Sequence, residues 1–170
     1  MEGKEQTMNN IILIGMPGAG KSTIGVVLAK VMQMDFCDTD LLIQRREGRA
    51  LQEILDTDGL ESFLKIENTV VSGLNCDNSV IATGGSVVLS DAAMAHLKKI
   101  GRVVYLRASF DAIQGRIHNL ATRGIAFAEG QTLQDIYRQR VPLYEAYADI
   151  TVDCGDFDCQ QVIQKIKARL

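Results

Sequence analysis

Short apolar runs alternate with longer segments of helical periodicity along the chain. Residues 10–14 form an apolar run rich in β-branched side chains, which predicts a buried strand. In residues 21–33 the apolar side chains recur at helical spacing, which predicts a helix, and residues 34–38 are expected to form a second strand. Together these segments predict a βαβ unit, in which a helix joins two parallel strands.

The same alternation continues through the rest of the chain. Further strands are expected over residues 79–83, 103–106 and 150–152, with helical segments around residues 51–55, 62–74, 92–98, 132–147 and 157–170. The pattern therefore predicts an α/β fold in three layers, a sandwich of five parallel strands with helices on both faces. Residues 119–130 contain two glycines and little periodicity, so a mobile loop is expected there.

Length and composition indicate a globular chain of one domain. Of the 170 residues, 46% are hydrophobic and 23% are charged, which excludes a disordered chain, and no apolar run approaches the roughly 20 residues that cross a bilayer. A formal charge of −3 gives no sign of a nucleic-acid surface. Residues 1–9 are polar and carry no export signal, so we expect a loose tail before a domain over residues 10–170. The default expectation is a monomeric, cytoplasmic protein whose four cysteines are free thiols.

The most specific motif follows the first predicted strand. Gly15, Gly20, Lys21 and Ser22 match the phosphate-loop pattern G-x-x-x-x-G-K-S, between a predicted strand and a predicted helix. Glycines let successive backbone N–H groups point at phosphates, and the helix N-terminus adds its partial positive charge. Lys21 would bridge the β- and γ-phosphates, and the Ser22 hydroxyl would bind Mg²⁺. The motif predicts nucleotide binding, against the competing interpretation of a glycine-rich turn with an incidental lysine.

Two carboxylates stand where the second predicted strand ends. Asp38 and Asp40 are two residues apart, so both side chains can face the ligand site at the carboxyl edge of a parallel sheet. One could serve Mg²⁺ and its waters while the other accepts hydrogen bonds from substrate hydroxyls. Taken alone, however, Asp40 is better explained as the N-cap of a helix.

Four motifs together resemble the shikimate kinase family. They are the phosphate-loop sequence GMPGAGKST, Asp38-Thr39-Asp40, Ala82-Thr83-Gly84-Gly85 and Arg140-x-Pro142-Leu143-Tyr144. The last motif is the most specific to that family among phosphate-loop kinases, and the resemblance covers residues 10–170. It implies a nucleoside-monophosphate-kinase-like fold with sheet order 2-3-1-4-5, a substrate-binding region at about residues 38–67 and a closing lid at about residues 117–130.

The resemblance also implies a reaction, the ATP-dependent phosphorylation of a shikimate hydroxyl to shikimate 3-phosphate in aromatic amino-acid biosynthesis, with Mg²⁺ as cofactor. Asp40 would hold the acceptor hydroxyls and, with Lys21 and the lid arginine Arg123, would be catalytic. The implied ATP site comprises Gly18, Ala19, Gly20, Lys21, Ser22, Thr23, Arg116 against the adenine, and Arg123 at the phosphates. The implied substrate site comprises Asp40, Gly84, Gly85 and Arg140, of which Arg140 binds the carboxylate, and the implied metal ligands are Ser22 and Asp38.

The chain departs from the family pattern at three places. Leu64 stands where the family has a second carboxylate-binding arginine. The glycine triplet ends in Ser86, whose hydroxyl could donate a hydrogen bond in place of the backbone. The lid motif Arg-Pro-Leu-Leu reads Arg-Gly-Ile-Ala over residues 123–126, which removes a proline that would restrain the loop. The first two departures fall in the acceptor region.

Three explanations of Leu64 stay open at this point. The enzyme could tolerate a weak affinity for its acceptor, or the natural acceptor could lack the carboxylate. Alternatively, a neighbouring cation could replace the arginine, and the candidates are Lys65, Arg45, Arg46 and Arg49.

Two other functions therefore compete with a shikimate kinase. The first is a diverged kinase with the same ATP site that acts on another polyol or sugar acid, as Leu64 would suggest. The second is a regulator that binds nucleotide without transfer, which predicts the loss of Lys21, Ser22 or Asp38, although all three are present.

Overall fold

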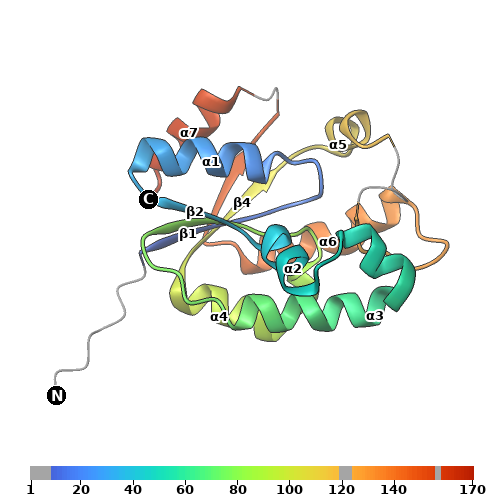
Figure 1. Ribbon diagram of the computed structural model, residues 1–170. Helices are drawn as coiled ribbons and strands as arrows, with labels where there is room; N and C mark the ends of the chain where they lie inside the picture. The colour runs from blue at the N-terminus through green and yellow to red at the C-terminus, as the bar shows by residue number, and fades with distance from the viewer. Residues whose placement is uncertain (1–8, 119–123, 156–157) are drawn as a thin grey trace, which may run out of the picture.

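The chain folds around a parallel sheet of five strands (Figure 1). This computed structural model describes residues 9–118, 124–155 and 158–170. The strands are β1 (Asn10–Ile14), β2 (Asp35–Asp38), β3 (Ser79–Ala82), β4 (Gly101–Arg107) and β5 (Ile150–Asp153). Their order is β2-β3-β1-β4-β5, and all neighbours are parallel, so the predicted strands and the predicted order are confirmed.

Helices cover both faces of this sheet. They are α1 (Lys21–Met32), α2 (Thr39–Glu47), α3 (Leu51–Ser72), the 3₁₀ helix η1 (Val87–Leu89), α4 (Asp91–Ile100), α5 (Phe110–Arg116), α6 (Leu133–Tyr147) and α7 (Cys159–Lys167). In Figure 1, α1 and α7 lie on one side of the strands, and α3, α4 and α6 lie on the other. The predicted three-layer arrangement is confirmed.

Strand β1 contributes to the core on both sides of the sheet, because successive side chains of a strand point to opposite faces. Ile11 and Leu13 pack in one cluster with buried residues of α1 and α7. Ile12 and Ile14 pack in another with buried residues of α4 and α6. A central strand that is covered on both faces explains why β1 reads as an unbroken apolar run.

Helix α2 is mostly polar and has no clear apolar stripe, so only the N-cap interpretation of Asp40 indicated a helix at this place. Its ends carry the signals instead. The Asp38 carboxylate accepts from the backbone N–H groups of Asp40 and Leu41, and Gly48 ends the helix in the left-handed conformation at φ 66°. The capping residue is therefore Asp38, and the interpretation of Asp40 as the N-cap is wrong.

Two more helices differ from expectation. Helix α5 was not predicted, because seven residues with one fully buried side chain give too short a pattern to detect. Helix α3 joins two segments that were expected separately, and Gly59 keeps a non-helical backbone inside it at φ 84°. This glycine explains why the apolar pattern of α3 is interrupted.

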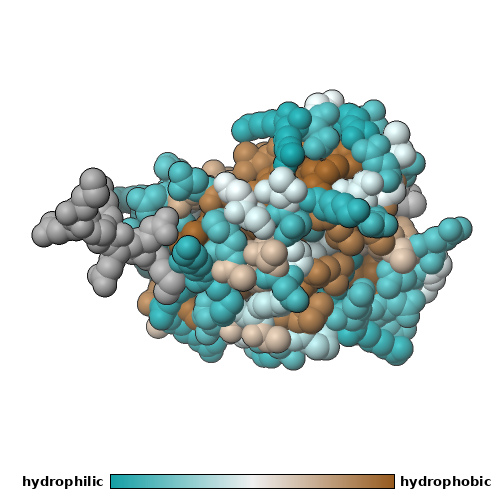
Figure 2. Space-filling view, turned by 90° about the horizontal axis from the view of Figure 1, so that it is seen from below, coloured by the Kyte–Doolittle hydropathy of each residue, from teal (hydrophilic) through white to brown (hydrophobic). Residues whose placement is uncertain are grey.

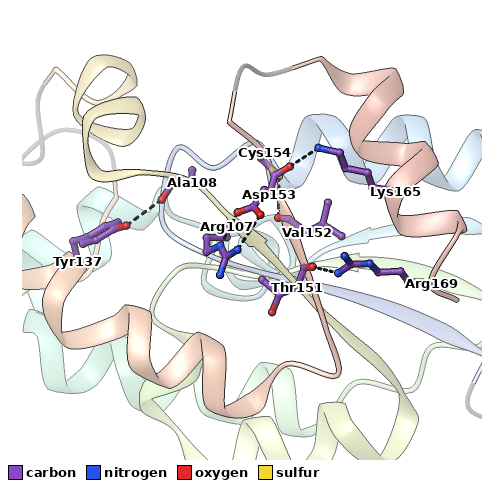
Figure 3. Close-up of polar contacts among 9 residues, drawn as sticks. All are labelled: Arg107, Ala108, Tyr137, Thr151, Val152, Asp153, Cys154, Lys165 and Arg169. Atoms are coloured by element: carbon purple, nitrogen blue, oxygen red, sulfur yellow. Dashed lines mark hydrogen bonds and ion pairs between the residues drawn. The ribbon is translucent and has the colours of Figure 1, made fainter.

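Polar contacts fix the edge strand β5 at its carboxyl end (Figure 3). Arg107 and Asp153 lie opposite each other in the β4–β5 register, and their side chains form two hydrogen bonds of 2.6 and 2.9 Å. Both side chains are largely exposed, so the pair contributes at most about 1 kcal/mol. Lys165 of α7 and Arg169, which follows the helix, donate to the backbone carbonyls of Asp153 and Thr151, and these contacts dock the C-terminal segment on the edge of the sheet.

The surface is mixed in polarity. Figure 2 shows one face on which apolar patches are separated by hydrophilic side chains. Elsewhere, Val26, Val27 and Val31 of α1 are exposed. Within the described part of the chain, no helix combines the length and the hydropathy that a bilayer crossing requires.

Candidate active site

The phosphate loop leaves β1 at Ile14 and enters α1 at Lys21. Gly15, Gly18 and Gly20 have φ angles of 152°, 81° and 95°, which side chains other than glycine rarely adopt. The N-cap of α1 is Gly20, so no side chain occupies the first amides of the helix. Those amides and the helix dipole are therefore available to an anion at this end of α1.

Lys21 is buried beneath the loop. Its ammonium group donates to the backbone carbonyls of Gly15 and Met16 at 2.7 and 2.8 Å. Burial lowers the pKa of Lys21 to about 8, while nearby carboxylates, Asp40 above all, oppose that shift. Phosphate groups in the loop would favour the charged lysine further. The fold thus holds a cation at the loop and balances it with carboxylates.

Ser22 and Asp38 meet at the open side of the loop. The Ser22 hydroxyl donates to Asp38 Oδ2 at 2.9 Å, while Asp38 Oδ1 caps α2. The two predicted metal ligands are therefore brought together from α1 and β2. Among the described residues, no group of three or more His, Cys, Asp or Glu side chains could hold a metal ion. One hydroxyl and one carboxylate suit Mg²⁺, which usually keeps waters and takes phosphate oxygens for its other positions.

A cavity of about 360 Å³ extends from the phosphate loop to α6. The phosphate loop and the start of α1 line it with Pro17, Gly18, Gly20, Lys21, Ser22 and Thr23, and other elements line it with Asp40, Glu67, Thr83, Gly84, Gly85, Ser86 and Arg140. Its apolar wall consists of Phe63, Ile117, Ile125 and Ala126, with Gly124 beside them. Of the predicted site residues that the structure describes, Ala19, Asp38 and Arg116 do not line this cavity. Most of the predicted site nevertheless converges on one space.

Asp40 and Glu67 both approach Gly84. A methyl group on Gly84 would lie 2.8 Å from Glu67 Oε2 and 2.9 Å from Asp40 Oδ1. Burial raises the pKa of Asp40 to about 6 and that of Glu67 to about 7. Glu67 is not among the predicted site residues, although it stands between Phe63 and Val71 at the buried spacing of α3, which was a usable signal.

The raised pKa of Glu67 predicts that its charge destabilises the free protein. The folded state binds a proton on this carboxyl between about pH 4.5 and 7 that the unfolded state has lost, so stability falls as the pH rises through this window. Glu67→Gln should therefore raise the free energy of unfolding at pH 8 by about 2 kcal/mol. The gain should vanish below pH 4.5, where both states carry a neutral carboxyl.

Urea unfolding of both proteins from pH 4 to 8 would test this prediction. Glu61→Gln is the matched control, because Glu61 lies on the same helix with an exposed side chain. An equal effect of Glu67→Gln at pH 4 and pH 8 would show that the carboxylate charge is not the cause.

Arg140 supplies a cation at the far end of the cavity and is only 1% exposed. Its Nη2 donates to the carbonyl of Ala126, whereas its Nε and Nη1 have no hydrogen-bond partner among the described residues. A buried N–H group without a partner costs free energy, and a charged one costs more. A ligand carboxylate could pair with Nε or with Nη1, because a charged guanidinium forms strong hydrogen bonds to this group.

Tyr144 follows Arg140 by one turn of α6 and fixes the backbone beside the site. Its hydroxyl donates to the carbonyl of Gly85 at 2.5 Å, and its ring stacks on Tyr105 with 5.2 Å between centroids. Helical spacing in the sequence indicates only that Tyr144 packs against the sheet. The structure adds a tether between α6 and the loop that follows β3.

None of the cations that were considered as replacements for the missing arginine lines the cavity. Lys65 is 75% exposed and pairs with Glu61. Arg46 and Arg49 form ion pairs on the surface near the α2–α3 turn, and Arg45 lies on that surface with them. The explanation by a neighbouring charge is therefore wrong. Leu64 itself packs at the edge of the apolar cluster around Phe63.

The remaining predicted arginines concern the nucleotide end and the lid. Arg116 ends α5 and donates to the carbonyl of Gly18 at 3.0 Å, which places it beside the phosphate loop. Arg123 lies outside the described residues. Within the expected lid, Ile125 and Ala126 are buried and form part of the cavity wall.

Comparisons with known proteins point to one family. Residues 17–170 match the family model described as shikimate kinase. A shikimate kinase of Pseudomonas paraeruginosa is 39% identical over 96% of this chain and 96% of its own length. The solved structure of a shikimate kinase from Acinetobacter baumannii in complex with shikimate is 32% identical with a TM-score of 0.86, over 95% of this chain and 92% of its own. A gluconokinase from Sinorhizobium meliloti, 15% identical with a TM-score of 0.54, over 94% of this chain and 90% of its own, shares the fold alone.

Proposed function

The chain belongs to the shikimate kinase family, and we propose that it transfers the γ-phosphoryl group of ATP to a hydroxyl of shikimate, giving shikimate 3-phosphate and ADP. One observation carries this proposal. A single cavity joins a phosphate loop to a buried guanidinium with two unpaired N–H atoms, so it offers places for a nucleotide phosphate and for an anionic acceptor. The two carboxylates between these ends suit the hydroxyls of a polyol.

On the nucleotide side, we assign the phosphates to the loop and the first turn of α1. The backbone of Gly18, Ala19 and Gly20, with Ser22 and Thr23 after it, would cradle them at the helix N-terminus. Lys21 would move its ammonium group from the loop carbonyls onto the β- and γ-phosphates and stabilise the charge that develops during transfer. Arg116, beside Gly18, would lie against the adenine.

On the acceptor side, Asp40 would hold the reacting hydroxyl in line with the γ-phosphorus. The hydroxyl oxygen would form the new bond to the γ-phosphorus as the bond from the γ-phosphorus to the bridging oxygen breaks, and Asp40 would accept the released proton. Its pKa of about 6 gives a carboxylate that is mostly ionised at pH 7 yet basic enough for this task. Gly84 and Gly85 would let the acceptor approach the backbone, and Arg140 would bind its carboxylate.

The cofactor of this reaction is proposed to be Mg²⁺, which would neutralise charge on the phosphates. Ser22 Oγ and Asp38 Oδ2 lie 2.9 Å apart beside the loop, so they would hold the ion together with phosphate oxygens and water. Asp38 also caps α2, and this cap fixes the carboxylate in place.

A substitution at Gly84 should damage the acceptor site without unfolding the chain. In Gly84→Ala the new methyl group would lie 2.9 Å from Asp40 Oδ1 and 2.8 Å from Glu67 Oε2, so both carboxylates would have to move. Because small errors in the position of a reacting group are costly, we expect kcat/KM for shikimate to fall about 10- to 100-fold. Gly115→Ala is the control, since nothing lies within 4 Å of that position. Equal activities of the two variants would contradict the placement of the acceptor beside Gly84.

The proposed function is tested by measuring ADP release from ATP and Mg²⁺ while shikimate is varied from micromolar to tens of millimolar, with quinate and gluconate in parallel. Saturation by shikimate is expected. Nucleotide binding without acceleration by shikimate would favour the alternative that Leu64 suggests, a kinase for another polyol or sugar acid. Nucleotide binding without turnover on any acceptor would favour a regulator.

A further inference from the structure

Two buried groups of opposite charge face the acceptor end of the cavity without pairing. The carboxylate of Glu67, 2% exposed, and the guanidinium of Arg140, 1% exposed, both line it. Neither Glu67 Oε2 nor the Nε and Nη1 atoms of Arg140 have a hydrogen-bond partner among the described residues. Opposite charges in a poorly solvated space attract each other strongly, so something must keep this carboxylate from the guanidinium.

Ser86 supplies that restraint. Its hydroxyl donates to Glu67 Oε1 at 2.7 Å, and this is the one hydrogen bond that the described residues provide to the Glu67 carboxylate. Ser86 is itself buried, on the loop that follows β3. The bond therefore ties Glu67 to the side of the cavity formed by this loop, whereas Arg140 approaches from α6.

Leu64 makes this restraint necessary. It lies one turn before Glu67 on α3, where a basic side chain would be a neighbour of the carboxylate, but a leucine offers it no hydrogen bond. Ser86 stands at the second departure from the family pattern, and its hydroxyl donates to the carboxylate that follows Leu64 by one helical turn. The other charged groups that face Glu67 are Asp40 and Lys21, and Lys21 donates to carbonyls of the phosphate loop.

We propose that Ser86 is a positioning residue that holds Glu67 away from Arg140, and so keeps the guanidinium free for the carboxylate of the acceptor. Without the Ser86 hydroxyl, Glu67 pairs with Arg140 and competes with the substrate. This inference rests on the proposed function, because it takes shikimate as the acceptor. It explains how one arginine serves a site where the family pattern has two.

Ser86→Ala tests the proposal, because it should change KM for shikimate and leave kcat and KM for ATP nearly unchanged. We expect KM for shikimate to rise about tenfold, the effect of losing one hydrogen bond to a charged group, while kcat and KM for ATP stay within about twofold. The dissociation constant of shikimate, measured by calorimetry without nucleotide, should rise by the same factor. Ser79→Ala is the matched control, a buried hydroxyl near the opposite end of β3 that donates to a backbone carbonyl.

Repeating the Ser86→Ala substitution in the Glu67→Gln variant distinguishes competition by the Glu67 carboxylate from any other role of Ser86. Gln at position 67 cannot form an ion pair, so adding Ser86→Ala to Glu67→Gln should change KM for shikimate less than twofold. A tenfold loss that persists in the Glu67→Gln background would overturn the proposal, as would an unchanged KM in Ser86→Ala. A cooperative thermal unfolding transition would show that each variant is folded. The proposed function would be contradicted by a different result, the absence of saturation by shikimate in the unaltered enzyme.

Discussion

Lys21→Ala should lower kcat about 10³-fold while the chain still folds. The ammonium group of Lys21 lies under the phosphate loop, and no other cationic side chain among the described residues lines that end of the cavity. Removing one preorganised donor from a site of developing charge typically lowers the rate 10²- to 10³-fold. Because Lys21 carries a full positive charge beside the transferring group, we expect its loss to fall at the upper end of this range. Steady-state ADP release at saturating shikimate and ATP would measure the loss.

The fold should tolerate this change, because the substitution removes a buried charge together with its two hydrogen bonds to backbone carbonyls. Lys30→Ala is the matched control on the same helix, where the lysine is exposed, and it should keep full activity. If Lys21→Ala retained more than a tenth of the turnover of the unaltered enzyme, the lysine would have no major part in phosphoryl transfer.

Arg140→Met should raise KM for shikimate between about 30-fold and several thousand-fold. Methionine replaces the volume of the side chain but leaves the acceptor carboxylate without a partner in a site that excludes water, and losing one partner of such a pair costs about 2–5 kcal/mol. KM for ATP should stay close to that of the unaltered enzyme, because Arg140 lies at the opposite end of the cavity from the phosphate loop.

The acceptor itself provides a second control for Arg140→Met. An analogue of shikimate in which the carboxylate is reduced to a hydroxymethyl group should bind the unaltered enzyme and the variant about equally. Arg138→Met, an exposed arginine on the same helix, should change neither constant. A loss of equal size with both acceptors would show that Arg140 maintains the shape of the site and does not bind the carboxylate.

The fold could be predicted from the sequence wherever local pattern and burial agree. The β1 segment is covered on both faces and therefore reads as continuous apolar sequence, and its turn into α1 carries the phosphate-loop motif. Helices α2 and α5 could not be predicted in this way. They are short and have few fully buried side chains, Thr39 and Ile43 in α2 and Ile113 in α5, so capping by Asp38 and Ser109 marks them more clearly than any apolar stripe.

The nucleotide half of the candidate site was determined by the sequence alone. Gly15, Gly20, Lys21 and Ser22 lie within eight consecutive residues between a strand and a helix, so chain connectivity fixes their relative positions. Asp38 also follows from local sequence, because it ends β2 at the carboxyl edge of the sheet, where the phosphate loop lies.

The family resemblance implied several residues of the acceptor half, but their arrangement was decided only by the tertiary structure. Glu67, Ser86 and Arg140 come from α3, from the loop after β3 and from α6, and the sequence does not state which way each helix turns its side chains. The sequence allowed the Ser86 hydroxyl to donate a hydrogen bond in place of the backbone, and in the structure it donates to Glu67. Packing of α3 and α6 against one side of the sheet brings these residues together, and such contacts depend on the rotation and separation of whole elements. That is why Ser86 reaches a carboxylate that lies 19 residues earlier in the sequence.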